Sequence, residues 1–330
     1  MMQDYAAPWF RARRLHGIDD TIYFGMIEPS DGKRHVFSVP HEQCDGVGAF
    51  MQLLRRIPVS DWRGVTGKSM PIPGFLQCWR AQQRKKKFEA PMWRKRALAA
   101  VDAKDQFIAV EYFSEEQTRR LRQQAKSDSV PLNAMLMAAL HNVVSEQLLV
   151  QGGGGWFVPV TLRGALTLPS DEMNHASGIC ISLTGRTDGV AIQQQLSQAI
   201  RNNEHWWMWH QARLVATLGG QWLVNRLLPL MQQRQHLGSF SSMGEWSIDW
   251  QGSDYPLDTL MWAVPPGSPA YPVAACWLIC NGRLVLMLKL NAVLGFGAER
   301  CQSLMKDWAI AIRSSLSSQF VGRNGEKCNA

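Results

Sequence analysis

The chain has no long apolar run. Of its 330 residues, 46% are hydrophobic, yet no stretch approaches the ~18 consecutive apolar residues of a membrane-spanning helix. The first residues, Met1-Met2-Gln3-Asp4-Tyr5, also lack the apolar centre of a secretion signal. We therefore expect a cytoplasmic protein without a transmembrane segment.

The cysteines lack the spacing of a metal site or a disulfide framework. There are seven, and none forms a Cys-x-x-Cys pair. An odd number without a secretion signal favours reduced thiols. We predict no metal site. For Cys44 we expect packing rather than nucleophilic chemistry, because its neighbours in the sequence supply no oriented base beyond His41.

Signals for phosphate and nucleic-acid binding are also missing. The glycines at 152–155 are followed by neither a Lys-Ser/Thr pair nor a helix start, so they do not predict a phosphate-binding loop. We interpret them as a flexible hinge and place a domain boundary near residue 150. No segment resembles a nucleic-acid-binding module, so no nucleic-acid partner is expected.

Positive charge is unevenly distributed. Residues 1–100 carry 17 Lys and Arg against 9 Asp and Glu, while residues 101–330 carry 18 of each. Most of the excess lies in residues 80–96, where Glu89 is the single acidic residue. Three interpretations remain open: a solvated connector, a docking surface for an anionic partner, and a nucleic-acid or membrane patch, of which the nucleic-acid version ranks last.

Hydrophobic periodicity alternates between strands and helices. Strands are expected at residues 21–27, 35–39, 156–162, 179–183, 246–250, 259–264, 272–280 and 283–290. Helices are expected at residues 47–57, 114–126, 132–149, 191–211, 220–234 and 298–316. Asn281-Gly282, between the last two strands, is a strong hairpin signal. The pattern predicts a mixed α/β (α+β) protein in two units, residues 1–150 and 151–330.

The most informative motif is His41-x-x-x-Asp45-Gly46, between an expected strand and an expected helix. A histidine at a strand end can present its imidazole to a cleft, and its ordinary pKa of about 6.5 lets it accept a proton near neutral pH. Asp and Gly suit a turn, since Asp bonds local backbone and Gly tolerates positive φ. The alternative is a strand-end histidine whose ring is satisfied by a backbone carbonyl.

Several segments, in chain order, resemble the chloramphenicol acetyltransferase-like superfamily of condensation domains, wax-ester synthases and BAHD acyltransferases. The motif at His41 is similar to its HxxxDG motif, and residues 113–140 are similar to its following helix pair. Residues 158–163 with Asn174 look like its "pVnlR … N" stretch, and residues 239–244 like its "SN-x-G" strand. Departures are Pro40, where condensation domains carry a first histidine, and Ser242, in place of the usual Asn. Only forty residues precede the motif, which implies a shortened or incomplete first lobe.

The resemblance implies two lobes with a tunnel between them. It also implies transfer of an acyl group from a CoA or carrier-protein thioester to a hydroxyl or amine of a small-molecule or lipid acceptor. His41 would be the general base, and Asp45 would hold the turn through an ion pair with Arg163. Ser242, or a backbone N–H near it, is expected to donate to the oxyanion, and Asn174 to line the tunnel. Acyl-CoA or a phosphopantetheine thioester would be a co-substrate, with no permanently bound cofactor.

Within this resemblance, the basic stretch would dock CoA or an acyl carrier protein. The residues expected to do so are Arg84, Lys85, Lys86, Lys87, Arg94, Lys95 and Arg96. Two other functions remain open. The lobe pair could be a non-catalytic binding or scaffold protein, or a degenerate family member. It could also be a peripheral membrane acyltransferase that makes a lipid ester, to which residues 79–96 would contribute.

Overall fold

The computed structural model describes residues 5–82, 89–95 and 107–325, with side chains as far as residue 316. The helices are α1 (Ala7–Leu15), α2 (Gly46–Leu54), α3 (Phe75–Gln82), α4 (Glu115–Ser127), α5 (Leu132–Leu148), α6 (Gly189–Arg201), α7 (Glu204–Gln232) and α8 (Ala298–Gly325). The strands are β1 (Thr21–Ile27), β2 (Arg34–Pro40), β3 (Asp61–Arg63), β4 (Met92–Trp93), β5 (Phe107–Tyr112), β6 (Leu149–Gln151), β7 (Gly153–Thr161), β8 (Ala176–Thr184), β9 (Gly238–Asp249), β10 (Leu260–Val264), β11 (Val273–Cys280) and β12 (Arg283–Leu290).

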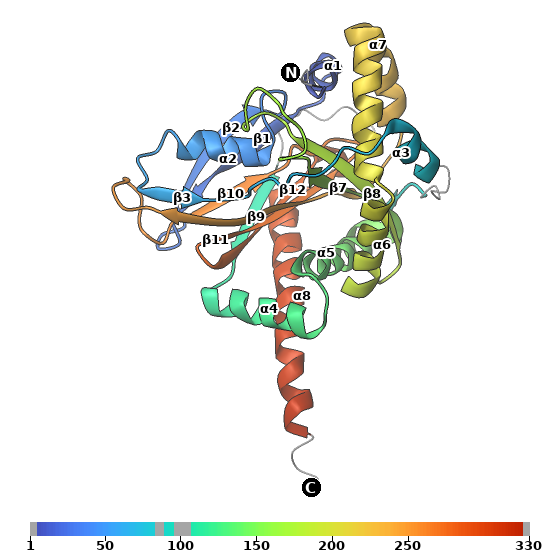
Figure 1. Cartoon of the computed structure of the whole chain (residues 1–330). Coiled ribbons are helices and arrows are strands. Elements are labelled where there is room, and N and C mark those ends of the chain that lie inside the picture. The colour runs from blue at the N-terminus through green and yellow to red at the C-terminus, as the bar shows by residue number, and fades with distance from the viewer. Residues whose placement is uncertain (1–4, 83–88, 96–106, 326–330) are drawn as a thin grey trace.

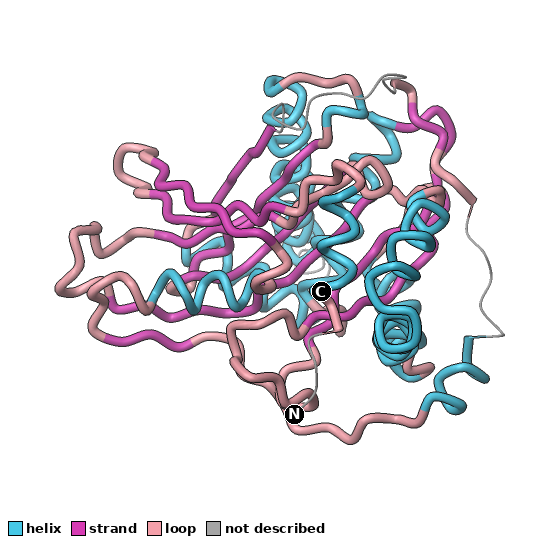
Figure 2. Tube along the Cα trace, turned by 90° about the horizontal axis from the view of Figure 1, so that it is seen from above, coloured by secondary structure: helices cyan, strands magenta, loops and turns pink. Residues whose placement is uncertain are grey.

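A large mixed sheet runs through the molecule in the order β5-β12-β11-β9-β7-β8, with β3 paired to β9 (Figures 1 and 2). β9 lies parallel to both β11 and β7, whereas β11 and β12 form an antiparallel hairpin. The two residues of that hairpin turn, Asn281 and Gly282, have φ values of 47° and 77°. Both are left-handed, which is why an Asn-Gly pair predicts this turn.

Helices α4, α5, α6 and α8 cover one face of the large sheet (Figure 1). Alternate residues of β12, such as Leu286 and Leu288, pack there against Leu140 of α5 and Trp308 of α8. α4 begins with the expected capping box, in which Ser114 and Gln117 each bond the other's backbone N–H. This helical layer forms the larger of the two main cores.

A small sheet of order β10-β1-β2 and helix α2 lie on the opposite face of the large sheet (Figure 1). Phe50 of α2 packs against Trp246 of β9, and Met287 of β12 belongs to the same core. The strand that leads to His41, β2, lies at the edge of this small sheet, pairs with β1 and adds Val39 to this core. This packing fixes the position of the strand end.

The expectation of a glycine hinge near residue 150 is wrong, while the division into residues 1–150 and 151–330 stays a prediction. The glycines at 153–155 are not a hinge but the start of β7, paired along its length with β8. The position near residue 150 does not separate the cores, because residues from both sides of it contribute to each. Pairing across strands therefore outweighs the local flexibility that a glycine run suggests.

Helix boundaries also differ. The chain turns at Asn203, which has a left-handed φ of 55°, so the helix expected at 191–211 is split between α6 and α7. The helix expected from residue 220 follows a true break, since Gly220 is non-helical inside α7. Among the residues that the structure describes, none of the helices is both long and apolar enough to cross a bilayer.

Candidate active site

His41 directly follows β2, at the point where the β1–β2 pairing ends. Pro40 pairs with Thr21, and the next rung is a bond from the His41 N–H to the Asp20 carbonyl at 3.0 Å. The Gln43 N–H then donates to the Pro40 carbonyl at 2.9 Å and closes a turn. The imidazole is therefore held at the end of a paired strand, and it is partly exposed.

Asp45 caps α2 and anchors the turn behind His41. Its Oδ1 accepts from the Gly48 N–H at 2.9 Å, and its Oδ2 accepts from the His175 N–H at 3.1 Å. Arg163 donates through Nη1 and Nη2 to the same carboxylate, with both distances 2.6 Å. Both side chains are buried, so the ion pair expected between Asp45 and Arg163 is present.

The need for glycine at position 46 has a different cause from the positive φ that the sequence suggested. It is the first residue of α2 and is not among the described residues with positive φ. A Cβ at this position would lie 2.8 Å from Met243 Sδ, and one at Gly48 would lie 2.0 Å from the Glu172 carbonyl oxygen. Close packing against neighbouring segments, not a left-handed turn, therefore explains the glycines here.

Asn174 contacts the imidazole directly. Its Nδ2 lies 2.9 Å from His41 Nδ1 and 3.4 Å from the His41 carbonyl oxygen. Its Oδ1 accepts from the Ala176 N–H at 3.0 Å, so the amide NH₂ faces the ring. Asn174 is buried. It therefore orients His41, a closer role than the tunnel lining that the sequence indicated.

Helix α1 covers the other side of His41. The Phe10 ring stacks on the imidazole with centroids 4.5 Å apart and planes 16° from parallel. Arg13 pairs with Asp20 at 2.6 Å, and Arg11 and Arg14 both pair with Glu42. Ion pairs thus fix α1 to Asp20, which bonds the His41 backbone from across the β1–β2 pair, and to Glu42, which follows His41 in the chain. The sequence predicted no site role for α1.

Burial has the largest effect on the titration of this region. It lowers the pKa of His41, while hydrogen bonding to the backbone of His41 itself and the charge of Asp45 act in the opposite direction. Burial also raises the pKa of Asp20 to about 6, against the influence of Arg13. The Cys44 thiol is buried as well, which raises its pKa to about 12 and makes it a poor nucleophile.

A second buried polar group lies on β12. Lys289 is fully buried, its Nζ donates to the Pro266 carbonyl at 3.3 Å, and it lies 4.9 Å from the centre of the Tyr23 ring. Burial lowers its pKa to about 8, and the charges of Asp19 and Asp20 oppose that shift. Sequence analysis missed this residue, because an apolar strand gives no signal that its one lysine points inward.

Ser242 forms no hydrogen bond with His41 within the part of the chain that the structure describes. Its side chain is exposed, and its hydroxyl accepts from the Gly244 N–H at 3.4 Å. Ser242 pairs with Trp277, which belongs to the core under the helical layer, whereas the adjacent Met243 packs in the core beneath α2. Alternation along β9 therefore points Ser242 and Met243 to opposite faces, and the role of Ser242 as oxyanion donor stays a prediction.

The basic stretch is only partly described. Arg84, Lys85, Lys86, Lys87 and Arg96 lie outside the described residues. Arg94 donates from Nε to the Leu149 carbonyl at 2.6 Å, and Lys95 Nζ lies 5.6 Å from the centre of the Phe296 ring. Both side chains are exposed yet make contacts within the chain. These contacts attach the end of β4 to β6, to the end of α5 and to Phe296, just before α8.

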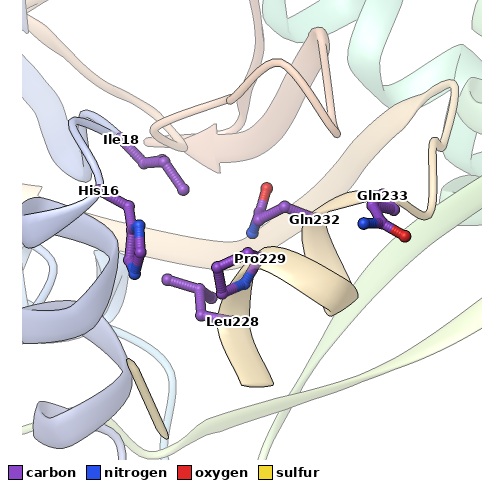
Figure 3. A pocket seen from close by; sticks show the side chains of 6 residues that line it. All are labelled: His16, Ile18, Leu228, Pro229, Gln232 and Gln233. Atoms are coloured by element: carbon purple, nitrogen blue, oxygen red, sulfur yellow. The ribbon is translucent and has the colours of Figure 1, made fainter. Parts of the chain in front are cut away.

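A shallow hollow of about 320 Å³ lies between the end of α1 and the end of α7 (Figure 3). The residues that line it are His16, Ile18, Leu228, Pro229, Gln232 and Gln233. His41 is not one of them. Among the described residues, no three His, Cys, Asp or Glu side chains are grouped so that they could hold a metal ion.

Comparison by sequence and comparison by structure gave different results. No family model and no curated protein sequence matches the chain. Among solved structures, the epimerization domain from the third module of tyrocidine synthetase B has a TM-score of 0.50 at 14% identity, over 86% of this chain and 68% of that one. The EpoB cyclization-docking bidomain from Sorangium cellulosum has a TM-score of 0.51 at 12% identity, over 86% and 60%.

The wax ester synthase/diacylglycerol acyltransferase from Marinobacter aquaeolei has a TM-score of 0.51 at 14% identity, over 86% of this chain and 68% of that one. The chain therefore spans 60 to 68% of the length of these structures. At such identities the likeness shows the fold alone. That fold, shared by condensation domains and acyltransferases, is the chloramphenicol acetyltransferase-like fold that the sequence resemblance implied, and this chain has it.

Proposed function

We propose that the chain is an acyltransferase in which His41 is the general base. The observation that carries the proposal is the support of the His41 imidazole. Asn174 contacts one ring nitrogen at 2.9 Å, and the turn behind the ring is held by the buried Asp45–Arg163 pair. A packing histidine needs no such arrangement. A base that must face a reacting hydroxyl or amine requires it.

In this reaction the acceptor O–H or N–H would give its proton to Nε2 of His41 as its oxygen or nitrogen attacks the thioester carbonyl carbon. The tetrahedral intermediate would then break its C–S bond, and the proton on His41 would pass to the leaving thiolate. A base of this kind contributes ~10²–10⁴-fold. Because burial lowers the pKa of His41, the neutral imidazole is favoured at neutral pH, and its Nε2 can accept a proton when the ring proton is on Nδ1.

The hydrogen bonds to His41 determine which of its two ring nitrogens can accept the proton of the acceptor. When the Asn174 amide donates to Nδ1, the neutral ring carries its proton on Nε2 and cannot accept there. When the ring proton is on Nδ1, the backbone carbonyl of His41 can accept it, and the amide can donate to that same carbonyl, now 3.4 Å away. We infer that Asn174 is a positioning residue that selects between these two states of His41.

The co-substrate we propose is a thioester of CoA or of an acyl carrier protein, and the acceptor a small molecule or lipid. These partners follow from the acyl-transfer proposal and from the excess of basic residues in 80–96. The basic side chains of that stretch would attract the phosphates of CoA or an acidic carrier surface. Exposed charges act mainly on association rate, so this contribution should weaken with salt.

A non-catalytic binding or scaffold protein is the second candidate. One observation favours it: Phe10 covers one face of the His41 ring. Such a protein would hold a thioester without transferring its acyl group. The two candidates therefore differ in turnover and not in ligand class.

The test is acceptor-dependent release of free thiol from panels of acyl-CoA and acyl-pantetheine thioesters, followed alongside direct binding of the same thioesters. An acyltransferase releases thiol only when a suitable alcohol or amine is added, and it yields the acylated acceptor by mass spectrometry. Binding of a thioester without product from any acceptor would instead support the scaffold. Neither binding nor turnover would contradict both.

A further inference from the structure

Helix α7 is a helical hairpin rather than one straight helix. Gly220 has φ 54° and ψ −153°, which breaks the helix at its middle. A straight helix of 29 residues would span about 43 Å. Instead both ends return to neighbouring strands: Ser177 of β8 donates to the His205 carbonyl, and Leu237 donates to Gly155 of β7. Figure 1 shows the second half of α7 running back beside the first.

The apex of this hairpin exposes large apolar side chains. Leu218 and Trp222, on either side of the Gly219-Gly220 break, are 75% and 67% exposed, and Leu214 one turn earlier is 44% exposed. The inward side of the hairpin is already packed, with Val224 and Leu228 buried against Ala12 of α1. The exposed residues therefore serve no core: Leu214 and Leu218 lie one helical turn apart before the break, and Trp222 follows directly after it.

The charged residues of the hairpin beyond its first residue, Glu204, are all positive. Residues 205–244 contain no Asp or Glu, and their charged side chains are Arg213, Arg226 and Arg234. The Arg226 guanidinium lies 5.6 Å from the centre of the Trp222 ring, and Arg213 lies 5.2 Å from that of Trp209. Both arginines are exposed. The apex thus combines leucine and tryptophan with nearby cationic groups.

We propose that the apex of α7 inserts into the surface of a membrane that contains anionic phospholipid. Leucine and tryptophan gain free energy on entering the interfacial region, and nearby arginine side chains are attracted to an anionic leaflet. The residues of this surface are not those of the basic stretch at 80–96. The proposal does not depend on catalysis and goes beyond the proposed function.

A second copy of the chain fits this apex less well. Stable protein interfaces bury about 800 Å² on each partner, whereas a projecting end offers a few side chains. Two copies meeting apex to apex would also bring Arg213 and Arg226 of each toward like charges. A lipid surface has neither restriction, since it moulds to a projecting tip and carries the opposite charge.

Flotation of the full chain with phosphatidylcholine vesicles, with and without phosphatidylglycerol, tests the proposal. We expect the wild type to float with the anionic vesicles and to dissociate as salt is raised. Leu218→Ser with Trp222→Ser should lower the partition coefficient at least tenfold, because the apolar surface that would enter the interface is lost. Arg213→Gln with Arg226→Gln should weaken binding to anionic vesicles and reduce its dependence on salt.

Leu257→Ser is the matched control, since Leu257 is 68% exposed and lies outside the hairpin, between β9 and β10. It should bind vesicles as the wild type does. All these residues are exposed, so circular dichroism should show unchanged folding. The proposal is overturned if the wild type does not float, if phosphatidylglycerol makes no difference, or if the apex double variant floats equally well. A wild-type dimer that the double variant abolishes, without vesicle binding, would assign the apex to self-association and overturn it too.

Discussion

Arg163 and Asp45, 118 positions apart in the sequence, form a buried bidentate ion pair with both nitrogen–oxygen distances at 2.6 Å. The same carboxylate also accepts backbone N–H groups from Gly48 and His175. The Asp45 side chain thus joins the start of α2 to Arg163, which follows β7, and to His175, which precedes β8. The pair holds the His41 turn against the rest of the fold.

Removing the charge of Asp45 should destabilise the protein. Asp45→Asn leaves the Arg163 guanidinium buried without its counter-charge, and breaking a buried pair in this way costs ~3–5 kcal/mol. Urea unfolding measures the loss. Glu172→Gln is the control, because Glu172 pairs with the exposed Arg55, and exposed pairs contribute ~0–1 kcal/mol. Equal stability of the two variants would contradict the structural role given to Asp45.

Local signals in the sequence were enough to find this part of the site. A strand that ends at His41, an Asp that can cap a helix, and a helix-spaced apolar stripe after it are all short-range patterns. The Asp45–Arg163 pair was reached through family resemblance, since nothing near residue 163 alone points to residue 45. The sequence suggested that Gly46 allows a positive φ, whereas glycine is needed there because Met243 lies close to it. That close approach depends on tertiary packing, which a local pattern does not show.

The contacts of α1 could not be predicted in the same way. A stacked pair such as Phe10 and His41 leaves no periodic trace in the sequence, and the three arginines of α1 read as ordinary surface charge. Residues 107–112 were likewise not assigned as a strand, because the evidence for β5 lies in its pairing with β12. The face to which Ser242 points follows from strand alternation, which a motif match does not resolve.

The stacking of Phe10 should control the titration of His41. Phe10→Ala opens one face of the imidazole to water, which should raise the pKa of His41 toward its ordinary value of about 6.5 because desolvation lowers it in the wild type. Phe10→Leu, which keeps the face covered, should change the pKa less. Histidine side-chain NMR over a pH series measures both. A His41 pKa that is the same in all three proteins would show that α1 does not shield the ring.

Asn174 should set the pH dependence of activity. In the wild type the lowered pKa of His41 keeps the base form present below pH ~6.5, so kcat/KM should fall only at more acidic pH. Asn174→Asp places a carboxylate next to Nδ1, raises the pKa of His41 and should move that fall to higher pH. Asn142→Asp makes the same change at a side chain that bonds Thr187. An unmoved profile in Asn174→Asp, matching Asn142→Asp, would contradict the positioning role.

Asp20 should contribute a pH-dependent stability term. Its pKa is raised from 3.8 to about 6 in the folded state, so folding favours the protonated carboxyl. The resulting stabilisation is complete below the unfolded pKa and is lost as pH rises through about 6. Asp20→Asn should therefore become more stable relative to the wild type by ~2–3 kcal/mol between about pH 4 and about pH 8. Urea unfolding at the two pH values measures this, and a constant difference would contradict the raised pKa.

The central claim is that His41 takes the proton of the acceptor, and single-turnover acyl transfer with His41→Ala tests it most directly. The matched control is His35→Ala, since His35 lies on the same strand and pairs with Glu28. We predict that His41→Ala lowers the transfer rate ~10²-fold or more with unchanged thioester binding and fold, while His35→Ala transfers at the wild-type rate. Transfer at the wild-type rate by a well-folded His41→Ala protein would contradict the account.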